Sequence, residues 1–97
     1  MINYTIEDGW LKIFDGRNAV LLEHISTVVV GPETPSTYYR GDAPTPRSWQ
    51  VLVRNAFNVD MVRLRFWVQQ YDDEAECEAA ARAFHLELIR DIARALK

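Results

Sequence analysis

The stretch VRLRFWVQQYDDEAE, residues 62–76, changes its periodicity near its centre. Apolar residues first occupy every second position, as in a β-strand with one buried face. One row of that strand comprises Val62, Leu64, Phe66 and Val68, and the other comprises Arg63, Arg65 and Trp67. After Tyr71 the alternation stops and apolar residues recur at helical spacing. The stretch therefore predicts a strand that is followed almost directly by a helix.

The helix is predicted over residues 73–97. Asp73 and Glu76 have the spacing of a capping box, in which the Asp73 carboxylate accepts from backbone N–H groups of the first turn. Acidic residues crowd the beginning of this segment and basic residues its end, which suits the helix dipole. The predicted apolar stripe contains Cys77, Ala81, Phe84, Leu88, Ile92 and Ala95, widened by Ile89 and Leu96. This stripe is expected to cover the apolar face of a sheet.

The first 30 residues predict strands near residues 2–7, 10–14 and 18–23. Two Asp-Gly pairs, Asp8-Gly9 and Asp15-Gly16, separate them and are typical of tight hairpin turns. Residues 19–30 are almost continuously apolar, which indicates a bend or bulge between two consecutive strands in a sheet covered on both sides.

The middle of the chain predicts a long loop followed by a hairpin. All four prolines lie in residues 31–48, which have no apolar periodicity. The hairpin is expected over residues 49–69, with Val51, Val53, Leu64 and Phe66 facing inward.

Together these elements predict a single α+β domain over residues 1–97. A curved antiparallel β-sheet of five or six strands would pack against one long C-terminal α-helix. This order resembles the small bacterial pleckstrin-homology-like domains, through AVLLEHISTVVV (residues 19–30), WQVLVRN (49–55), MVRLRFWV (61–68) and the helix from Asp73. The resemblance implies that fold but not lipid binding, because the basic phosphoinositide-binding motif has no counterpart around residues 12–17.

Net charge, cysteine count and apolar content limit the kinds of function that this chain can have. A net charge of −3 argues against a general nucleic-acid binder, which should be basic. Cys77 is the only cysteine, so an intrachain disulfide and a cysteine zinc site are excluded, and Cys77 is expected to pack as a small apolar group. No apolar run reaches the length of a membrane span and no secretion signal is recognisable, which predicts a cytoplasmic protein without membrane contact. No metal site and no cofactor is predicted.

Catalysis finds little support in the sequence. His24 and His85 are the only histidines, and neither lies in a catalytic or metal-binding motif. Each is expected to be a boundary histidine with a ring nitrogen hydrogen-bonded to backbone. The carboxylates of residues 72–74 are explained by helix capping.

The candidate binding surface is the outward face of the predicted hairpin. It carries Leu52, Arg54, Arg63, Arg65 and Trp67. Three interpretations compete: a solvated face whose arginines pair with carboxylates such as Glu7 or Glu23, a protein-binding or homodimer face, and a site for an anionic ligand. Tyr38 and Tyr39 are candidate contacts from the loop.

We therefore expect a non-catalytic interaction or scaffold domain, with a homodimer as its simplest version. The alternative function is binding of an anionic small ligand or single-stranded nucleic acid by Arg54, Arg63, Arg65 and Trp67.

Overall fold

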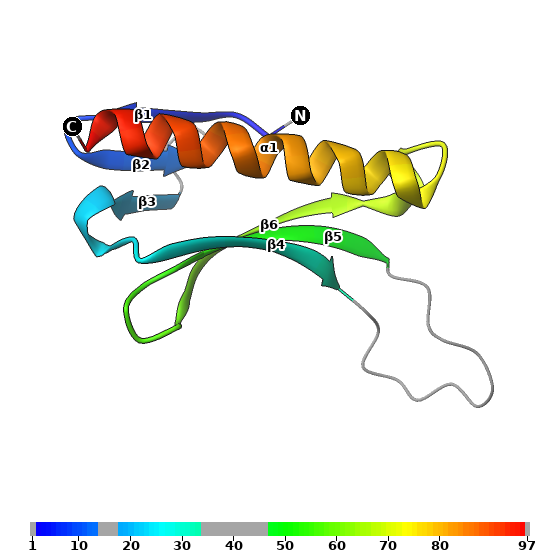
Figure 1. The fold of residues 1–97 in the computed structure, drawn as a ribbon, viewed down its shortest axis with the longest axis horizontal. Helices are drawn as coiled ribbons and strands as arrows, with labels where there is room; N and C mark the ends of the chain where they lie inside the picture. The colour runs from blue at the N-terminus through cyan, green and yellow to red at the C-terminus, as the bar shows by residue number, and fades with distance from the viewer. Residues whose placement is uncertain (1, 14–17, 34–46, 97) are drawn as a thin grey trace.

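The computed structural model describes residues 2–13, 18–33 and 47–96. Over these ranges the chain has an α+β fold with two three-stranded antiparallel sheets and one C-terminal helix (Figure 1). Sheet A contains β1 (Tyr4–Glu7), β2 (Trp10–Ile13) and β3 (Asn18–Leu21), in that order. Sheet B contains β4 (Thr27–Glu33), β5 (Ser48–Arg54) and β6 (Asp60–Trp67), also in sequence order. The 3-10 turns η1 (Leu22–His24) and η2 (Val68–Gln70) precede β4 and the helix α1 (Glu74–Ala95).

The expectation of one continuous curved sheet is not confirmed, because the strands divide at η1. The amide of Leu22 donates to the carbonyl of Gly9 and the amide of Ile25 donates to the carbonyl of Leu22, so the chain coils between β3 and β4. The bend predicted within residues 19–30 is therefore a 3-10 turn. It shortens the strand expected over residues 18–23, and it leaves His24 exposed rather than at a boundary.

The first Asp-Gly pair forms the predicted turn between β1 and β2. Asp8 and Gly9 both have positive φ angles, 52° and 81°, which this type of turn requires. The second pair, Asp15-Gly16, lies outside the described residues.

Sheet B extends into the segment that the sequence predicted as loop. Gly31, Pro32 and Glu33 continue β4, and Ser48 begins β5 opposite Glu33. Proline is tolerated at this position because β4 lies at an edge of sheet B, where a missing N–H costs no ladder hydrogen bond. Arg47 is described and its amide donates to the carbonyl of Glu33, whereas residues 34–46 of the predicted loop lie outside the described part of the chain.

Helix α1 begins and ends close to its predicted limits. Asp73 is the N-cap, and its carboxylate accepts from the amide of Glu76 at 2.8 Å. The buried side of the helix consists of Cys77, Ala81, Phe84, Leu88 and Ile92. Ala95, Ile89 and Leu96 were also expected to be buried and are instead exposed, so the apolar residues of α1 occupy two sides of the helix.

The core lies where α1 crosses the inner face of sheet B, with β1 and β2 beside the C-terminal half of the helix (Figure 1). Phe84 is central: its ring centroid lies 5.5 Å from that of Tyr4 in β1 and 5.5 Å from that of Phe66 in β6. Cys77 is fully buried, as expected, and its thiol lies 3.2 Å from the carbonyl oxygen of Phe66.

Within the described residues, no helix is both long enough and apolar enough to cross a membrane.

Candidate functional site

The predicted binding residues lie on one face of sheet B, turned away from α1. Leu52 and Arg63 are cross-strand partners, and Arg54, Arg65 and Trp67 follow in the same alternating rows of β5 and β6. We call Leu52, Arg54, Arg63, Arg65 and Trp67 the arginine face. Leu52 belongs to this face by register but is only 6% exposed, between its neighbours Val29 and Arg63, so it is not available for binding.

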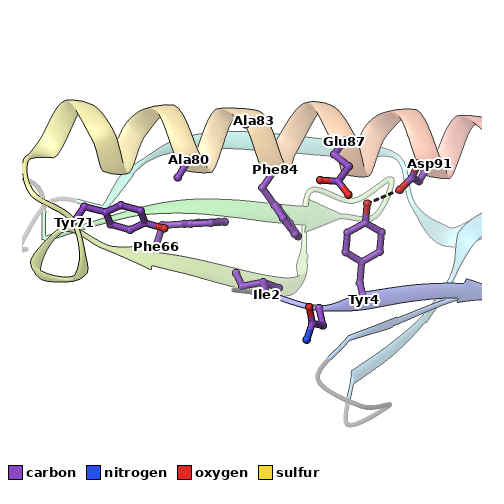
Figure 2. A pocket seen from close by; sticks show the side chains of 10 residues that line it. Ile2, Tyr4, Phe66, Tyr71, Ala80, Ala83, Phe84, Glu87 and Asp91 are labelled. Carbon is purple, nitrogen blue, oxygen red and sulfur yellow. Dashed lines mark hydrogen bonds between the residues drawn. The ribbon is translucent and has the colours of Figure 1, made fainter.

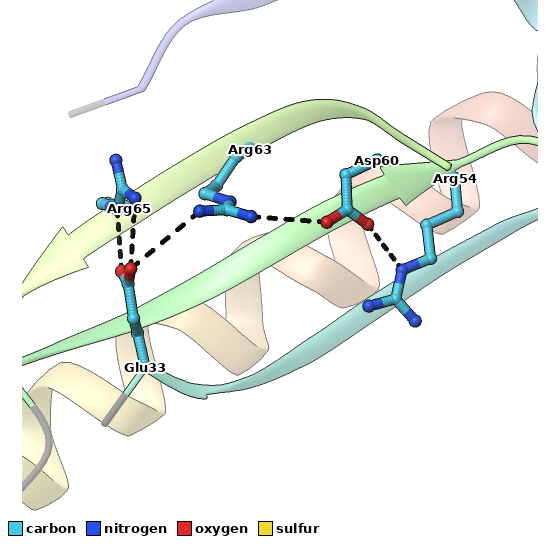
Figure 3. Close-up of polar contacts among 5 residues, drawn as sticks. All are labelled: Glu33, Arg54, Asp60, Arg63 and Arg65. Atoms are coloured by element: carbon cyan, nitrogen blue, oxygen red, sulfur yellow. Dashed lines mark hydrogen bonds and ion pairs between the residues drawn. The ribbon is translucent and has the colours of Figure 1, made fainter. Parts of the chain in front are cut away.

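The three arginines of this face are paired with two carboxylates (Figure 3). Arg65 donates to both carboxylate oxygens of Glu33, at 2.7 and 3.1 Å, and Arg63 reaches the same carboxylate at 4.0 Å. Arg54 donates to Asp60 at 2.7 Å and Arg63 to Asp60 at 3.4 Å. Pairing of these arginines with carboxylates was one of the three interpretations of this face, and these ion pairs agree with it. Its candidate partners, Glu7 and Glu23, were wrong: Glu7 pairs with Lys12, and Glu23 is exposed in η1.

Hydrogen bonding holds both carboxylates in their charged form. The hydrogen bond from Arg65, and next that from Ser48, lower the pKa of Glu33 to about 2. The hydrogen bond from Arg54 is the largest cause that lowers the pKa of Asp60. Because Arg54 and Arg65 already donate to carboxylates that are part of the fold, an anionic ligand would have to compete with those carboxylates for the two positive charges.

Trp67 lies at the end of the arginine face and is 39% exposed. The guanidinium carbon of Arg65 lies 5.8 Å from the centroid of the Trp67 ring, within the range of a cation–π contact. Trp67 is therefore partly covered by Arg65. Tyr38 and Tyr39, the candidate loop contacts, lie outside the described residues.

An open groove runs between α1, the start of β1 and the end of β6 (Figure 2). Its volume is about 610 Å³, and its lining is mostly apolar, with Ile2, Phe66, Tyr71 and Phe84. At one end the Tyr4 hydroxyl donates to Asp91 at 2.5 Å, and the Glu87 carboxylate points toward the same tyrosine (Figure 2). The shape and charge of the groove suit an apolar group that carries a positive charge. The sequence did not indicate this groove, because β1 and α1 lie at opposite ends of the chain.

The environment of Tyr4 keeps its phenol protonated. Burial is the main cause that raises the pKa of Tyr4, and the hydrogen bond to Asp91 is the next. Tyr4 therefore serves as a hydrogen-bond donor throughout the neutral pH range.

The outward side of α1 carries a second apolar stripe. Leu86 is 61% exposed, Ile89 is 39% exposed and Leu96 is 58% exposed. With the exposed alanines of the same side, the stripe comprises Ala75, Ala79, Leu86, Ile89, Ala93 and Leu96, which we call the outer stripe. The sequence contained this signal, since these positions follow one another at intervals of three, four and seven residues, but Ile89 and Leu96 were assigned to the buried side.

Two other potentially reactive side chains, those of His85 and Cys77, make contacts within the fold. The Nε2 atom of His85 lies 2.8 Å from the carbonyl oxygen of Val28 on β4, as expected of a boundary histidine. Burial raises the pKa of the Cys77 thiol, which lowers its reactivity. Among the described residues, no group of three or more histidine, cysteine, aspartate or glutamate side chains could hold a metal ion.

Comparisons with protein-family models, with curated proteins and with solved structures found no match to this chain. The resemblance to pleckstrin-homology-like domains stays a prediction.

Proposed function

We propose that this chain is a non-catalytic interaction domain that binds a protein partner through the outer stripe of α1. The observation that carries the proposal is the exposure of Leu86, Ile89 and Leu96 on one side of a helix whose opposite side is already buried. The solvent side of an amphipathic helix is normally polar, and an exposed apolar patch on a small domain is typical of an interface.

The outer stripe supports this function better than the arginine face does. On the arginine face Leu52 is buried, Arg65 is bound to Glu33 and Arg54 to Asp60. These ion pairs already give Arg54 and Arg65 carboxylate partners within the same chain. The outer stripe has large apolar groups in contact with water, and their burial against a partner would contribute about 25 cal/mol for each Å² removed from solvent.

The alternative, binding of an anionic ligand or single-stranded nucleic acid, receives less support. Three guanidinium groups stand against two carboxylates, so only one positive charge on this face is uncompensated. With a net charge of −3 for the whole chain, that charge provides little attraction for a polyanion.

The non-catalytic part of the proposal rests on the state of the reactive groups. His85 is bonded to a backbone carbonyl and Cys77 is buried in the core. Neither is placed to act on a substrate.

Affinity capture from a cell extract tests the proposal with three forms of the chain. The variant Leu86→Glu/Ile89→Glu places charges in the outer stripe, where both native side chains are exposed and the fold should persist. The control is Phe57→Glu, which makes the same kind of change at an apolar side chain that is 86% exposed in the β5–β6 turn.

We expect at least one protein to be retained by the wild type and by the control and to be lost from the double variant. The purified partner should then bind the wild type and Phe57→Glu but not Leu86→Glu/Ile89→Glu. The proposal would be contradicted if all three forms captured identical sets of proteins and also had the same mass in solution.

A further inference from the structure

We propose that the partner of the outer stripe is a second copy of this chain, packed so that the two α1 helices run antiparallel. This inference rests on the proposed function and names its partner. Three properties of α1 support it: the spacing of the stripe, the distribution of side-chain size along it and the distribution of charge beside it.

The spacing is that of helices that pack along their length. With Arg82 included, the stripe positions follow one another at alternating intervals of four and three residues: Ala75, Ala79, Arg82, Leu86, Ile89, Ala93 and Leu96. An average interval of 3.5 residues keeps a stripe facing a second helix over several turns. The 22 residues of α1 extend for about 33 Å, which gives room for three such repeats.

Arg82 does not bring a free charge into the middle of the stripe. Its guanidinium donates to Glu78 at 2.7 Å and lies 5.3 Å from the centroid of the Trp49 ring. The contact with Trp49 on β5 places the charged end of the side chain toward sheet B. Its aliphatic carbons are left beside Leu86, where they can pack against an apolar partner.

Side-chain size favours the antiparallel orientation. The N-terminal end of the stripe has only the small residues Ala75 and Ala79, whereas the C-terminal part has Leu86, Ile89 and Leu96 and one small residue, Ala93. In an antiparallel pair Ala75 of one helix faces Leu96 of the other, so both ends of the pair combine a small with a large side chain, while Ala79 faces Ala93. A parallel pair would align alanine with alanine and leave a gap between the first turns.

Charge favours the same orientation. The first turns carry Glu74, Glu76 and Glu78, and the last turns carry the exposed Arg90 and Arg94. Antiparallel packing brings the acidic end of one copy beside the basic end of the other, and it also pairs opposite ends of the two helix dipoles. Parallel packing would bring like charges together at both ends.

The predicted dimer is weak. A single pair of helices of this length buries less surface than the roughly 800 Å² per partner of a standard interface. We therefore expect dissociation in the micromolar range, so that both monomer and dimer are accessible to measurement.

Sedimentation velocity at about 5 and about 500 µM tests the association. The wild type and Phe57→Glu should move from the monomer mass of 11.2 kDa toward twice that value as concentration rises. Leu86→Glu/Ile89→Glu should remain a monomer at both concentrations. A wild type that is monomeric throughout, or a dimer that the double variant retains, would overturn the inference.

Cysteine cross-linking tests the orientation, and the buried Cys77 should not interfere. Ala79→Cys and Ala93→Cys lie near opposite ends of the stripe, so a mixture of the two proteins should form mixed disulfide dimers in an antiparallel pair. Each variant alone should cross-link poorly. Efficient self-cross-linking of Ala79→Cys would indicate a parallel pair and contradict the proposed orientation.

These outcomes separate the inference from the proposed function. If the chain is monomeric but the double variant loses a captured partner, the outer stripe binds another protein and only the second-copy inference fails. If neither association nor capture depends on Leu86 and Ile89, both proposals fail.

Discussion

The hydroxyl of Tyr4 in β1 donates a hydrogen bond of 2.5 Å to the carboxylate of Asp91 near the end of α1. The two partners are 87 positions apart in the sequence, and the Tyr4 ring packs edge-on against Phe84, which lies about two turns before Asp91 on the same face of α1. This pair attaches the beginning of the chain to its last helix. It also forms the polar end of the groove between them (Figure 2).

Tyr4→Phe should remove the hydrogen bond while leaving the ring against Phe84. We expect a loss of about 1 kcal/mol in the free energy of unfolding, measured by urea denaturation. Tyr4→Ala removes the ring as well and should cost about 3 kcal/mol. Equal losses from both substitutions would show that the ring does not contribute through packing.

The raised pKa of Tyr4 also predicts a dependence of stability on alkaline pH. Its phenol has a higher pKa in the folded chain than the value of about 10 expected when unfolded. The stabilisation is therefore complete below pH 10 and is lost as the pH rises toward the folded pKa. Denaturant midpoints measured between about pH 8 and 11 should fall more steeply for the wild type than for Tyr4→Phe. Parallel curves would contradict this assignment.

Acidic pH should weaken the contribution of Glu33. Its pKa of about 2 in the folded chain lies below the value of about 4.3 expected for an unfolded glutamate. The stabilisation is fully present above that unfolded value and is lost as the pH falls toward 2. Glu33→Gln should therefore flatten the fall in the free energy of unfolding, measured by urea denaturation, between about pH 5 and 2.

Phe84→Ala should be among the most damaging single substitutions in α1. The side chain contacts the rings of both Tyr4 and Phe66, so its removal leaves a cavity between α1 and the two sheets and should cost about 3 to 5 kcal/mol. Asp73→Ala removes only the N-cap hydrogen bond to Glu76 and should cost about 0.5 to 2 kcal/mol. Thermal unfolding followed by circular dichroism would compare the two, and similar small losses would mean that Phe84 does not belong to the core.

The elements that the sequence predicted well depend on local signals. The N-cap at Asp73, the turn at Asp8-Gly9 and the alternation of Val62, Leu64 and Phe66 with the arginines are all visible within a few residues. Each of these signals acts between neighbours in the chain. They can therefore be recognised without knowledge of the rest of the fold.

The features that escaped prediction depend on how distant segments meet. Glu33 became the partner of Arg65 because β4 extends past a proline at the sheet edge, and no local pattern indicates that extension. Tyr4 and Asp91 meet only after sheet A has docked on α1. The two apolar sides of α1 were merged because apolar residues occupy most of the helix circumference, so periodicity alone could not decide which side the sheets would cover.

Trp67→Ser tests whether the chain associates through the arginine face or through the outer stripe. Trp67 is 39% exposed and out of phase with the buried row of β6, so the fold should survive and the free energy of unfolding should change by no more than about 0.5 kcal/mol. Because the outer stripe lies on α1, away from this face, the concentration dependence of the mass in solution should equal that of the wild type. Sedimentation velocity and circular dichroism on this variant, beside Leu86→Glu/Ile89→Glu, provide the measurement. If Trp67→Ser abolished association with its fold intact, the interface would lie on the arginine face, because no change at Trp67 can remove contacts made by Leu86 and Ile89 on a different element.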